Sequence, residues 1–202
     1  MKTNEALKIV GGLSKPSKMP GWAYGIPAAE CKTGGILKNV KGSTCEGCYA
    51  DKGCYVFAVV QAAQYRRLKS INHPQWVNAM AALINSKKSK WFRWHDSGDI
   101  QSVEHLFKIF SIARLTPGTK HWLPTREAWT QKYDNKKYKP DNLTLRFSMP
   151  MVDQPASGSW QNTSTVVSGA GRTCPAPNQG NECKDCRACW DPSVKNVAYG
   201  KH

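Results

Sequence analysis

Eight cysteines are the residues of this 202-residue chain with the most evident chemistry, and they form two groups. The C-terminal group follows the pattern C-x2-C-x2-C with a fourth cysteine upstream: Cys174, Cys183, Cys186 and Cys189. Three thiolates within one turn of irregular backbone can converge on a single iron–sulfur cubane, and a fourth usually arrives from elsewhere in the sequence. We therefore expect Cys174 to supply the fourth thiolate of an iron–sulfur cluster.

A structural zinc ion is the main alternative at the C-terminal group, because a tetrahedral ion also takes four thiolates. Zinc sites more often use two separated C-x2-C pairs than three closely spaced cysteines, which favours iron and sulfide. Free or disulfide-bonded thiols are the third alternative. The N-terminus shows no secretory signal, and a reducing cytoplasm keeps thiols available for metal. We expect a cytoplasmic protein.

The N-terminal group is less regular: Cys31, Cys45, Cys48 and Cys54. It follows an expected strand and precedes an expected helix, where α/β folds bind cofactors. Cys54 is a fourth candidate ligand, or else a bystander buried in the core, because it opens an apolar helical stretch. The other three would leave one iron of a [4Fe–4S] cluster open, or would hold a [3Fe–4S] cluster. One cluster shared by both groups is a further alternative, so we expect one or two clusters.

Reactive side chains are also concentrated at the end of the expected strand 91–95 and in the loop after it, up to residue 99. Its catalytic candidates are His95, Asp96 and Asp99, and its candidate cofactor-binding residues are Arg93, Ser97 and Gly98. An imidazole can transfer a proton, and a glycine lets backbone approach a ligand closely. Strand alternation predicts that Arg93 and His95 share one face. The alternative is a helix cap at Asp99 with a buried hydrogen bond between His95 and Asp96.

Arg126 and Glu127 end the next expected strand in the same manner and are further candidate cofactor-binding residues. A guanidinium can clamp a carboxylate or phosphate with two hydrogen bonds. The alternative for Arg126 is a surface ion pair. Because two successive strands both end in polar clusters, a functional site is better supported than it would be by one cluster alone.

The hydrophobic pattern alternates strands with helices and predicts an α/β fold. The expected strands cover residues 22–26, 91–95, 120–123, 142–149 and 163–168, and the expected helices cover 55–71, 75–85 and 102–115. Strands without strict polar alternation indicate a mostly parallel sheet or an incomplete (β/α) barrel. Irregular parts are a cysteine-rich loop and a tail from Cys174. We expect an irregular N-terminal arm over residues 1–21 and one domain over 22–202, with His105 on a helix surface.

The composition is that of a basic globular protein. Hydrophobic residues make up 40% of the chain, and 29 lysines and arginines against 14 acidic residues give a formal net charge of +15. This charge favours nucleic acid or another acidic partner. No apolar run is long enough for a membrane helix, so we expect no membrane partner. The sequence does not indicate an oligomeric state.

Three segments together resemble a phage-encoded cysteine-rich iron–sulfur family with distant radical-SAM-like features. They are Gly25-Ile-Pro-Ala with the cysteines at 31, 45 and 48, then Arg93-x-His95-x-Ser97-Gly98-Asp99, then the C-terminal cysteine group. The resemblance covers about residues 22–202 and implies the cytoplasm of an infected bacterium. It implies that Ser97-Gly98-Asp99 corresponds to the radical SAM motif that holds the amine of S-adenosylmethionine. The C-x3-C-x2-C signature is missing, and the chain is short for a full barrel.

These observations predict an iron–sulfur protein that acts as a redox or radical-SAM-like enzyme on a small molecule or a nucleic acid. The alternative is a basic nucleic-acid-binding module, or a phage structural or host-interaction protein, in which iron–sulfur or zinc sites are structural.

Overall fold

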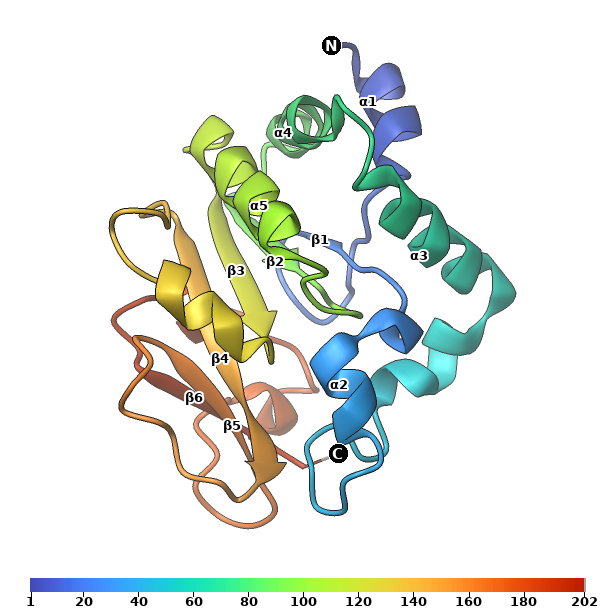
Figure 1. The fold of residues 1–202 in the computed structure, drawn as a ribbon. Helices are drawn as coiled ribbons and strands as arrows, with labels where there is room; N and C mark the ends of the chain where they lie inside the picture. Colours follow the sequence, from blue (N-terminus) through green and yellow to red (C-terminus); the bar gives the residue numbers. More distant parts are fainter. Residues whose placement is uncertain (202) are drawn as a thin grey trace.

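Six parallel strands that pair in chain order form the centre of the computed structural model, which describes residues 1–201 (Figure 1). The strands are β1 (Trp22–Tyr24), β2 (Trp91–Trp94), β3 (Lys120–Thr125), β4 (Leu143–Val152), β5 (Thr163–Val167) and β6 (Asn196–Gly200). Each strand pairs in parallel with the next one along the chain. The sheet is open because β1 and β6 are its edges. The predicted α/β fold with a parallel, incompletely closed sheet is confirmed.

The helices are short and lie beside the sheet. They are α1 (Thr3–Val10), α2 (Lys32–Leu37), α3 (Ala58–Ser70), α4 (Trp76–Ser86) and α5 (Val103–Leu115), with 3-10 turns η1 (Ala28–Glu30), η2 (Tyr49–Asp51), η3 (Gly53–Val56), η4 (Ala128–Tyr133), η5 (Ala176–Asn178) and η6 (Ala188–Trp190). In residues 1–201 no helix has both the length and the apolar character that crossing a membrane requires.

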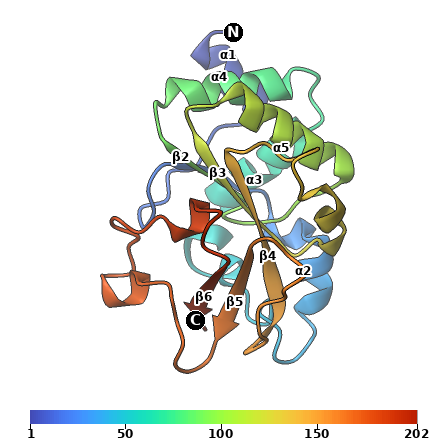
Figure 2. The same ribbon diagram turned by 90° about the vertical axis from the view of Figure 1, so that its left-hand side faces the viewer.

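The main core lies between α4, α5 and one face of the sheet, which we call the outer face (Figure 2). Phe92 and Trp94 of β2 and Leu123 of β3 point to this face and are almost completely buried. Alternation therefore sends Arg93 and Trp122 to the opposite, inner face. Full burial of each large apolar side chain contributes roughly 1.5–3 kcal/mol, so the outer face supplies most of the hydrophobic stabilisation.

The predicted irregular N-terminal arm is wrong over residues 3–10, which form α1. Ala6 and Val10 are fully buried on its inward side, and Gly11 ends the helix in the left-handed conformation with φ 80°. The Tyr24 hydroxyl lies 3.0 Å from the Val10 carbonyl oxygen and donates to it. The glycines and prolines that suggested disorder follow this helix, and α4 covers its apolar face.

The predicted irregular tail is wrong at its end, where residues 196–200 form β6. Five residues pair in register from Thr163↔Asn196 to Val167↔Gly200. A five-residue segment after a proline-rich stretch carries too little periodicity to identify alone, and the exposed edge of β5 supplies its hydrogen-bond partners.

Two histidines in the outer layer are buried without charge. His105 was expected on a helix surface but is only 1% exposed, because α5 turns it toward Trp76 and His95. His121 is fully buried; its Nδ1 accepts from the Trp94 indole at 3.2 Å, and its Nε2 lies 2.8 Å from the Thr116 hydroxyl. Burial lowers the pKa of each imidazole to about 3.

We expect His121 to make the protein less stable in acid. Its pKa falls from 6.5 to about 3 on folding, so between these values only the unfolded chain binds the proton. Stability is full above pH 6.5 and falls as pH drops through this window, by roughly 3 kcal/mol at pH 4. Urea unfolding of His121→Gln should show a flatter pH dependence than wild type, whereas exposed His73→Gln should not change it. Equal slopes for wild type and His121→Gln would contradict this account.

Candidate functional site

The C-terminal segment crosses the inner face of the sheet and is held there by Trp190. The Trp190 ring packs edge-on against Trp91 at 5.6 Å and against Trp122 at 5.3 Å. Its indole nitrogen donates to the Phe92 carbonyl oxygen at 2.9 Å. This indole places the segment that carries three cysteines directly over β2 and β3.

A fully buried arginine fixes the backbone around the last of these cysteines. Arg146 of β4 donates to the carbonyl oxygens of Ala188 and Asp191, both at 2.7 Å, and of Cys189 at 3.0 Å. A guanidinium offers five N–H donors in a rigid fork, so the buried Arg146 can hold the three carbonyl groups in one orientation. Arg146 therefore positions Cys189, and these hydrogen bonds offset part of the free-energy cost of burying its guanidinium.

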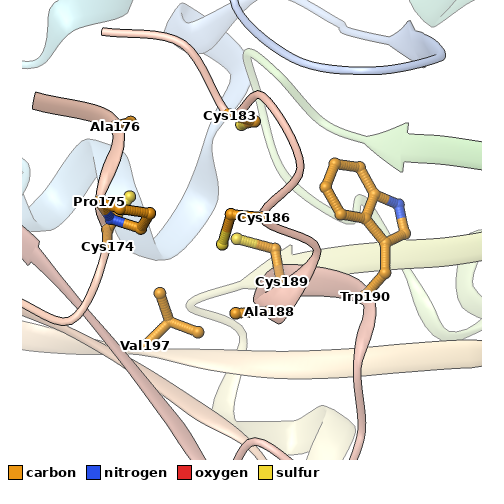
Figure 3. A pocket seen from close by; sticks show the side chains of 9 residues that line it. All are labelled: Cys174, Pro175, Ala176, Cys183, Cys186, Ala188, Cys189, Trp190 and Val197. Carbon is orange, nitrogen blue, oxygen red and sulfur yellow. The ribbon is translucent and has the colours of Figure 1, made fainter. Parts of the chain in front are cut away.

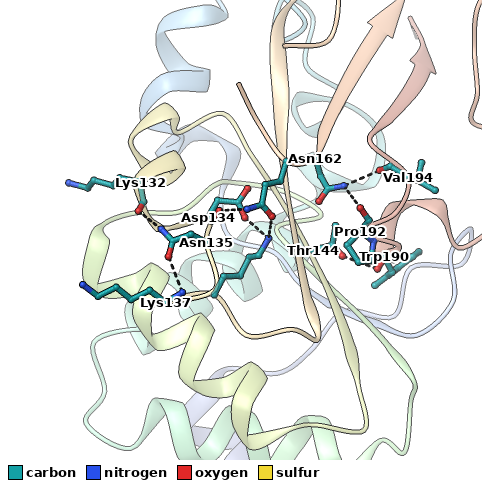
Figure 4. Close-up of polar contacts among 11 residues, drawn as sticks. Lys132, Asp134, Asn135, Lys137, Thr144, Asn162, Trp190, Pro192 and Val194 are labelled. Carbon is teal, nitrogen blue, oxygen red and sulfur yellow. Dashed lines mark hydrogen bonds and ion pairs between the residues drawn. The ribbon is translucent and has the colours of Figure 1, made fainter. Parts of the chain in front are cut away.

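Two shorter polar side chains extend this anchor (Figure 4). The Thr144 hydroxyl donates to the Trp190 carbonyl oxygen at 2.8 Å. The Asn162 amide donates to the carbonyl oxygens of Pro192 and Val194 at 2.9 and 3.0 Å. Thr144 and Asn162 thus hold the segment that follows Cys189 by its backbone carbonyl oxygens.

The four C-terminal cysteines line one small pocket together with Trp190 and Val197 (Figure 3). Cys174 comes from one side and Cys183, Cys186 and Cys189 from the other. The Cys174 amide donates to the Ala198 carbonyl oxygen of β6 at 3.0 Å. The predicted grouping of Cys174 with the C-x2-C-x2-C run therefore agrees with where the structure places these residues.

The thiols of this pocket favour the neutral form. Burial raises the pKa of Cys189 to about 11, although a hydrogen bond from Tyr199 and the charge of Arg146 act in the opposite direction. Burial also raises the pKa of Cys183, with the neighbouring Cys174 and Cys186 adding to the shift. A cationic metal centre would therefore have to displace protons on binding, and its affinity would rise with pH.

Three of the N-terminal cysteines lie near one another at the carboxyl ends of the strands, and the fourth is exposed. Both the Cys31 and Cys45 sulfurs lie within 3.7 Å of the position that a Cβ would take on Gly34. Burial raises the pKa of Cys31 to about 12, and the charges of Asp99, Cys48 and Cys45 raise it further. Cys54 is exposed on η3. The prediction that the core buries it is therefore wrong.

Backbone hydrogen bonds hold the loop that carries Cys45 and Cys48 against the end of β4. Ser43 and Met151 form an antiparallel bridge, and the Thr44 amide donates to the Pro150 carbonyl oxygen at 2.8 Å. The Ser43 hydroxyl accepts from the Cys45 amide at 3.2 Å. These contacts place a long, glycine-rich loop at a defined position over the sheet.

Glu127 ties Cys31 and its helix to the end of β3. It is 4% exposed; its Oε1 accepts from the Thr33 amide at 3.1 Å and its Oε2 from the Trp129 indole at 2.9 Å. Both carboxylate oxygens are thus engaged within the protein. Glu127 was expected to bind a cofactor, and the geometry instead gives it a positioning role toward the cysteine loop.

Arg126 points to the same cysteines. Its Nη1 donates to the carbonyl oxygens of Ser148 and Met149 at 3.0 and 2.8 Å, and its guanidinium charge acts on Cys45. The alternative of a surface ion pair is therefore wrong. An arginine beside three thiols can offset the negative charge that they acquire as thiolates.

The prediction that Arg93 and His95 share one face is wrong. His95 has a φ of 51°, so the strand alternation stops at Trp94. The His95 ring lies 5.5 Å from the His105 ring on the outer side, whereas the Arg93 guanidinium lies 4.6 Å over the Trp122 ring on the inner side. A left-handed residue is uncommon outside glycine and often marks a functional site.

The loop after β2 keeps several polar atoms buried. Within residues 1–201, both His95 ring nitrogens, the Asp96 Oδ1 and the Ser97 hydroxyl have no hydrogen-bond partner. The alternative of a buried hydrogen bond between His95 and Asp96 is therefore wrong. Burying such atoms costs about 1–3 kcal/mol each, a cost typical of groups kept for a ligand or for chemistry.

Asp99 ties β2 to β3 and does not cap α5. Its Oδ2 accepts from the Arg126 amide at 2.8 Å and its Oδ1 from the Ile100 amide at 2.7 Å. Burial raises the pKa of this carboxyl to about 6. The cap of α5 is Ser102, whose hydroxyl accepts from the His105 amide at 3.1 Å. Gly98, with φ 80°, sits where a Cβ would lie 2.3 Å from Ile26, so it serves close packing with the β1 loop.

The described residues contain no group of three histidine, cysteine or acidic side chains that could hold a single metal ion. Four thiolates around zinc lie about 2.3 Å from the ion and hence about 4 Å from one another. In a cubane each thiolate binds a different iron, so the sulfurs stand farther apart.

Sequence reasoning missed two residues that the structure places at these sites. Arg146 lies in an apolar strand, and an arginine within NLTLRFSM is a signal that could have been noticed. Tyr199, whose hydroxyl lies 3.1 Å from the Cys189 sulfur, belongs to the unpredicted β6 and offered no local signal.

A model of the Gene product 88 family matches residues 1–156. The chain belongs to this family. It is a family of bacteriophage proteins. The match includes the N-terminal cysteine group and the loops after β2 and β3, and it ends before the C-terminal group. Neither the curated proteins nor the solved structures contain a match to the chain.

We expect Glu127→Ala to lower the free energy of unfolding by about 2–4 kcal/mol. The change leaves the Thr33 amide and the Trp129 indole without their acceptor in a buried place. Urea unfolding measures this loss, and faster reaction of the Cys31 thiol with a maleimide would report loosening of its loop. Glu104→Ala is the control, because its carboxylate is 76% exposed and its ion pair with Lys108 contributes little. Equal effects of the two changes would refute the positioning role.

Proposed function

We propose that this phage protein is an iron–sulfur enzyme with a catalytic cluster on Cys31, Cys45 and Cys48 and a second cluster on the four C-terminal cysteines. The observation that carries the proposal is the meeting of three thiols at the carboxyl ends of a parallel sheet, beside Asp99 and Arg126. Parallel α/β folds bind ligands at this edge.

The donor sets fit clusters better than single ions. Both groups consist of cysteines, which is the ligand type of iron–sulfur centres and of zinc. The sulfurs at each site are near enough to influence one another's ionisation. The run of three closely spaced cysteines, Cys183, Cys186 and Cys189, supports iron and sulfide over zinc.

The N-terminal group differs from the C-terminal group by one thiolate, and this difference supports its catalytic assignment. Cys54 is exposed on η3, and we propose that it is not a ligand of this cluster. When bound there, a four-iron cluster supplies an electron and one coordination position that no cysteine fills. At the C-terminal group the four thiolates would fill every position.

The neighbouring residues can bind and orient a polar ligand. Ser97 keeps an unpartnered hydroxyl, and Asp96 keeps an unpartnered carboxylate oxygen. Each Asp99 oxygen accepts one backbone hydrogen bond, and the Thr125 hydroxyl adds a third contact to this carboxylate. A carboxylate can accept about four hydrogen bonds, so one position is left for a ligand. We propose S-adenosylmethionine as the ligand, with Asp99 accepting from its amine. The substrate class is a small molecule or a nucleic acid, and the net charge of +15 favours an anionic one.

We expect anaerobically prepared protein to contain iron and acid-labile sulfide in equal amounts, and little zinc. The Cys45→Ala and Cys186→Ala variants should each lack about half of the iron, because the two cysteines belong to separate four-iron sites. Cys54→Ala is the matched control and should keep the full content. Zinc without sulfide would overturn the proposal, and loss of all iron in both variants would indicate one shared cluster.

We expect S-adenosylmethionine to change the EPR spectrum of the dithionite-reduced protein, because it would occupy the open iron of the N-terminal cluster. The change should disappear in Asp99→Asn, which weakens the contact to the amine, and persist in Cys186→Ala, which removes only the other cluster. A spectrum that S-adenosylmethionine leaves unaltered would refute this ligand while leaving the clusters in place. Retention of the change after alanine replaces all three N-terminal cysteines would refute the site.

A further inference from the structure

Tyr199 meets the C-terminal cysteine group directly. Its hydroxyl oxygen lies 3.1 Å from the Cys189 sulfur, within hydrogen-bond distance for sulfur. A metal-bound thiolate has no proton to give, so at a loaded site the tyrosine hydroxyl is the donor and the sulfur the acceptor.

The backbone on both sides of Tyr199 is fixed. The Ala198 amide donates to the Thr173 hydroxyl at 2.9 Å, and the Ala198 carbonyl oxygen accepts from the Cys174 amide at 3.0 Å. Tyr199 itself pairs with Val166 in the sheet. The strand β6 therefore fixes both the backbone of Cys174 and the tyrosine that contacts Cys189.

Two arginines add positive charge to the same sulfur. The guanidinium groups of Arg146 and Arg93 both act electrostatically on Cys189. Reduction of a cluster adds negative charge that spreads onto its sulfurs, so a donated hydrogen bond and nearby cations stabilise the reduced form more than the oxidised form.

We propose that Tyr199 is a positioning residue that raises the reduction potential of the C-terminal cluster by donating a hydrogen bond to the sulfur of Cys189. This inference rests on the proposed second cluster and assigns it a redox role in place of a purely structural one. Hydrogen bonds to the sulfurs are one of the means by which a protein sets the reduction potential of an iron–sulfur cluster.

The test compares Tyr199→Phe with the parent protein in the full chain, with Cys31 and Cys48 changed to alanine so that only the C-terminal cluster contributes. Potentials are set with dithionite, and the reduced cluster is counted by EPR. At the parent's midpoint potential, the ratio of reduced to oxidised cluster should fall about tenfold in Tyr199→Phe, which is about 59 mV for a one-electron couple. Tyr138→Phe, remote from the cysteines on the α5 side, should leave the midpoint unchanged.

A second measurement detects the proposed hydrogen bond directly. Deuterium ENDOR of the reduced cluster with Cys31 and Cys48 replaced should show an exchangeable proton coupled to the cluster, and Tyr199→Phe should lose this coupling. An unchanged midpoint at full iron and sulfide content would overturn the role of Tyr199 and leave the proposed function standing. Absence of iron and sulfide from the wild-type protein would overturn both.

Discussion

Parallel hydrogen bonding between successive strands determines where every reactive loop of this protein lies. The strands β1 through β6 pair in chain order and point in the same direction. The segments that follow β1, β2 and β3 therefore all leave the sheet at the carboxyl ends of the strands. The first carries the N-terminal cysteines, the second the polar residues 95–99, and the third Arg126 and Glu127. Groups that are distant in sequence become neighbours only through this pairing.

The two cysteine groups are attached to that sheet by different means. The N-terminal loop is held at the strand ends by Glu127 and by bonds from residues 43–44 to the end of β4. The C-terminal segment is held against the inner face by Arg146 and Trp190, both fully or almost fully buried. One group therefore lies at the edge where ligands enter a parallel α/β fold, and the other lies against the inner face of the sheet. This separation is the physical basis for giving them different roles.

Buried polarity is spread unevenly over the two faces. The outer face buries His105 and His121 as neutral rings within an otherwise apolar core, where their hydrogen bonds to backbone or side chains offset part of their desolvation. Next to them, His95 and Asp96 lie in the same buried layer with unpartnered atoms. A fold can retain such unfavourable groups when they serve a ligand, and their place after β2 adjoins the N-terminal cysteines through Asp99.

The sequence by itself determined the fold class, the grouping of the C-terminal cysteines and the polar ends of β2 and β3, because hydrophobic periodicity and close ligand spacing are local properties. Only the tertiary structure decided that residues 3–10 form a helix, that β6 exists, and that Arg93 and His95 diverge. Each of these depends on a partner far along the chain or on a single left-handed residue. The eight cysteines stood in the sequence, but the contacts of Arg146, Glu127 and Tyr199 with them arise from folding alone, since strand pairing brings together residues tens of positions apart.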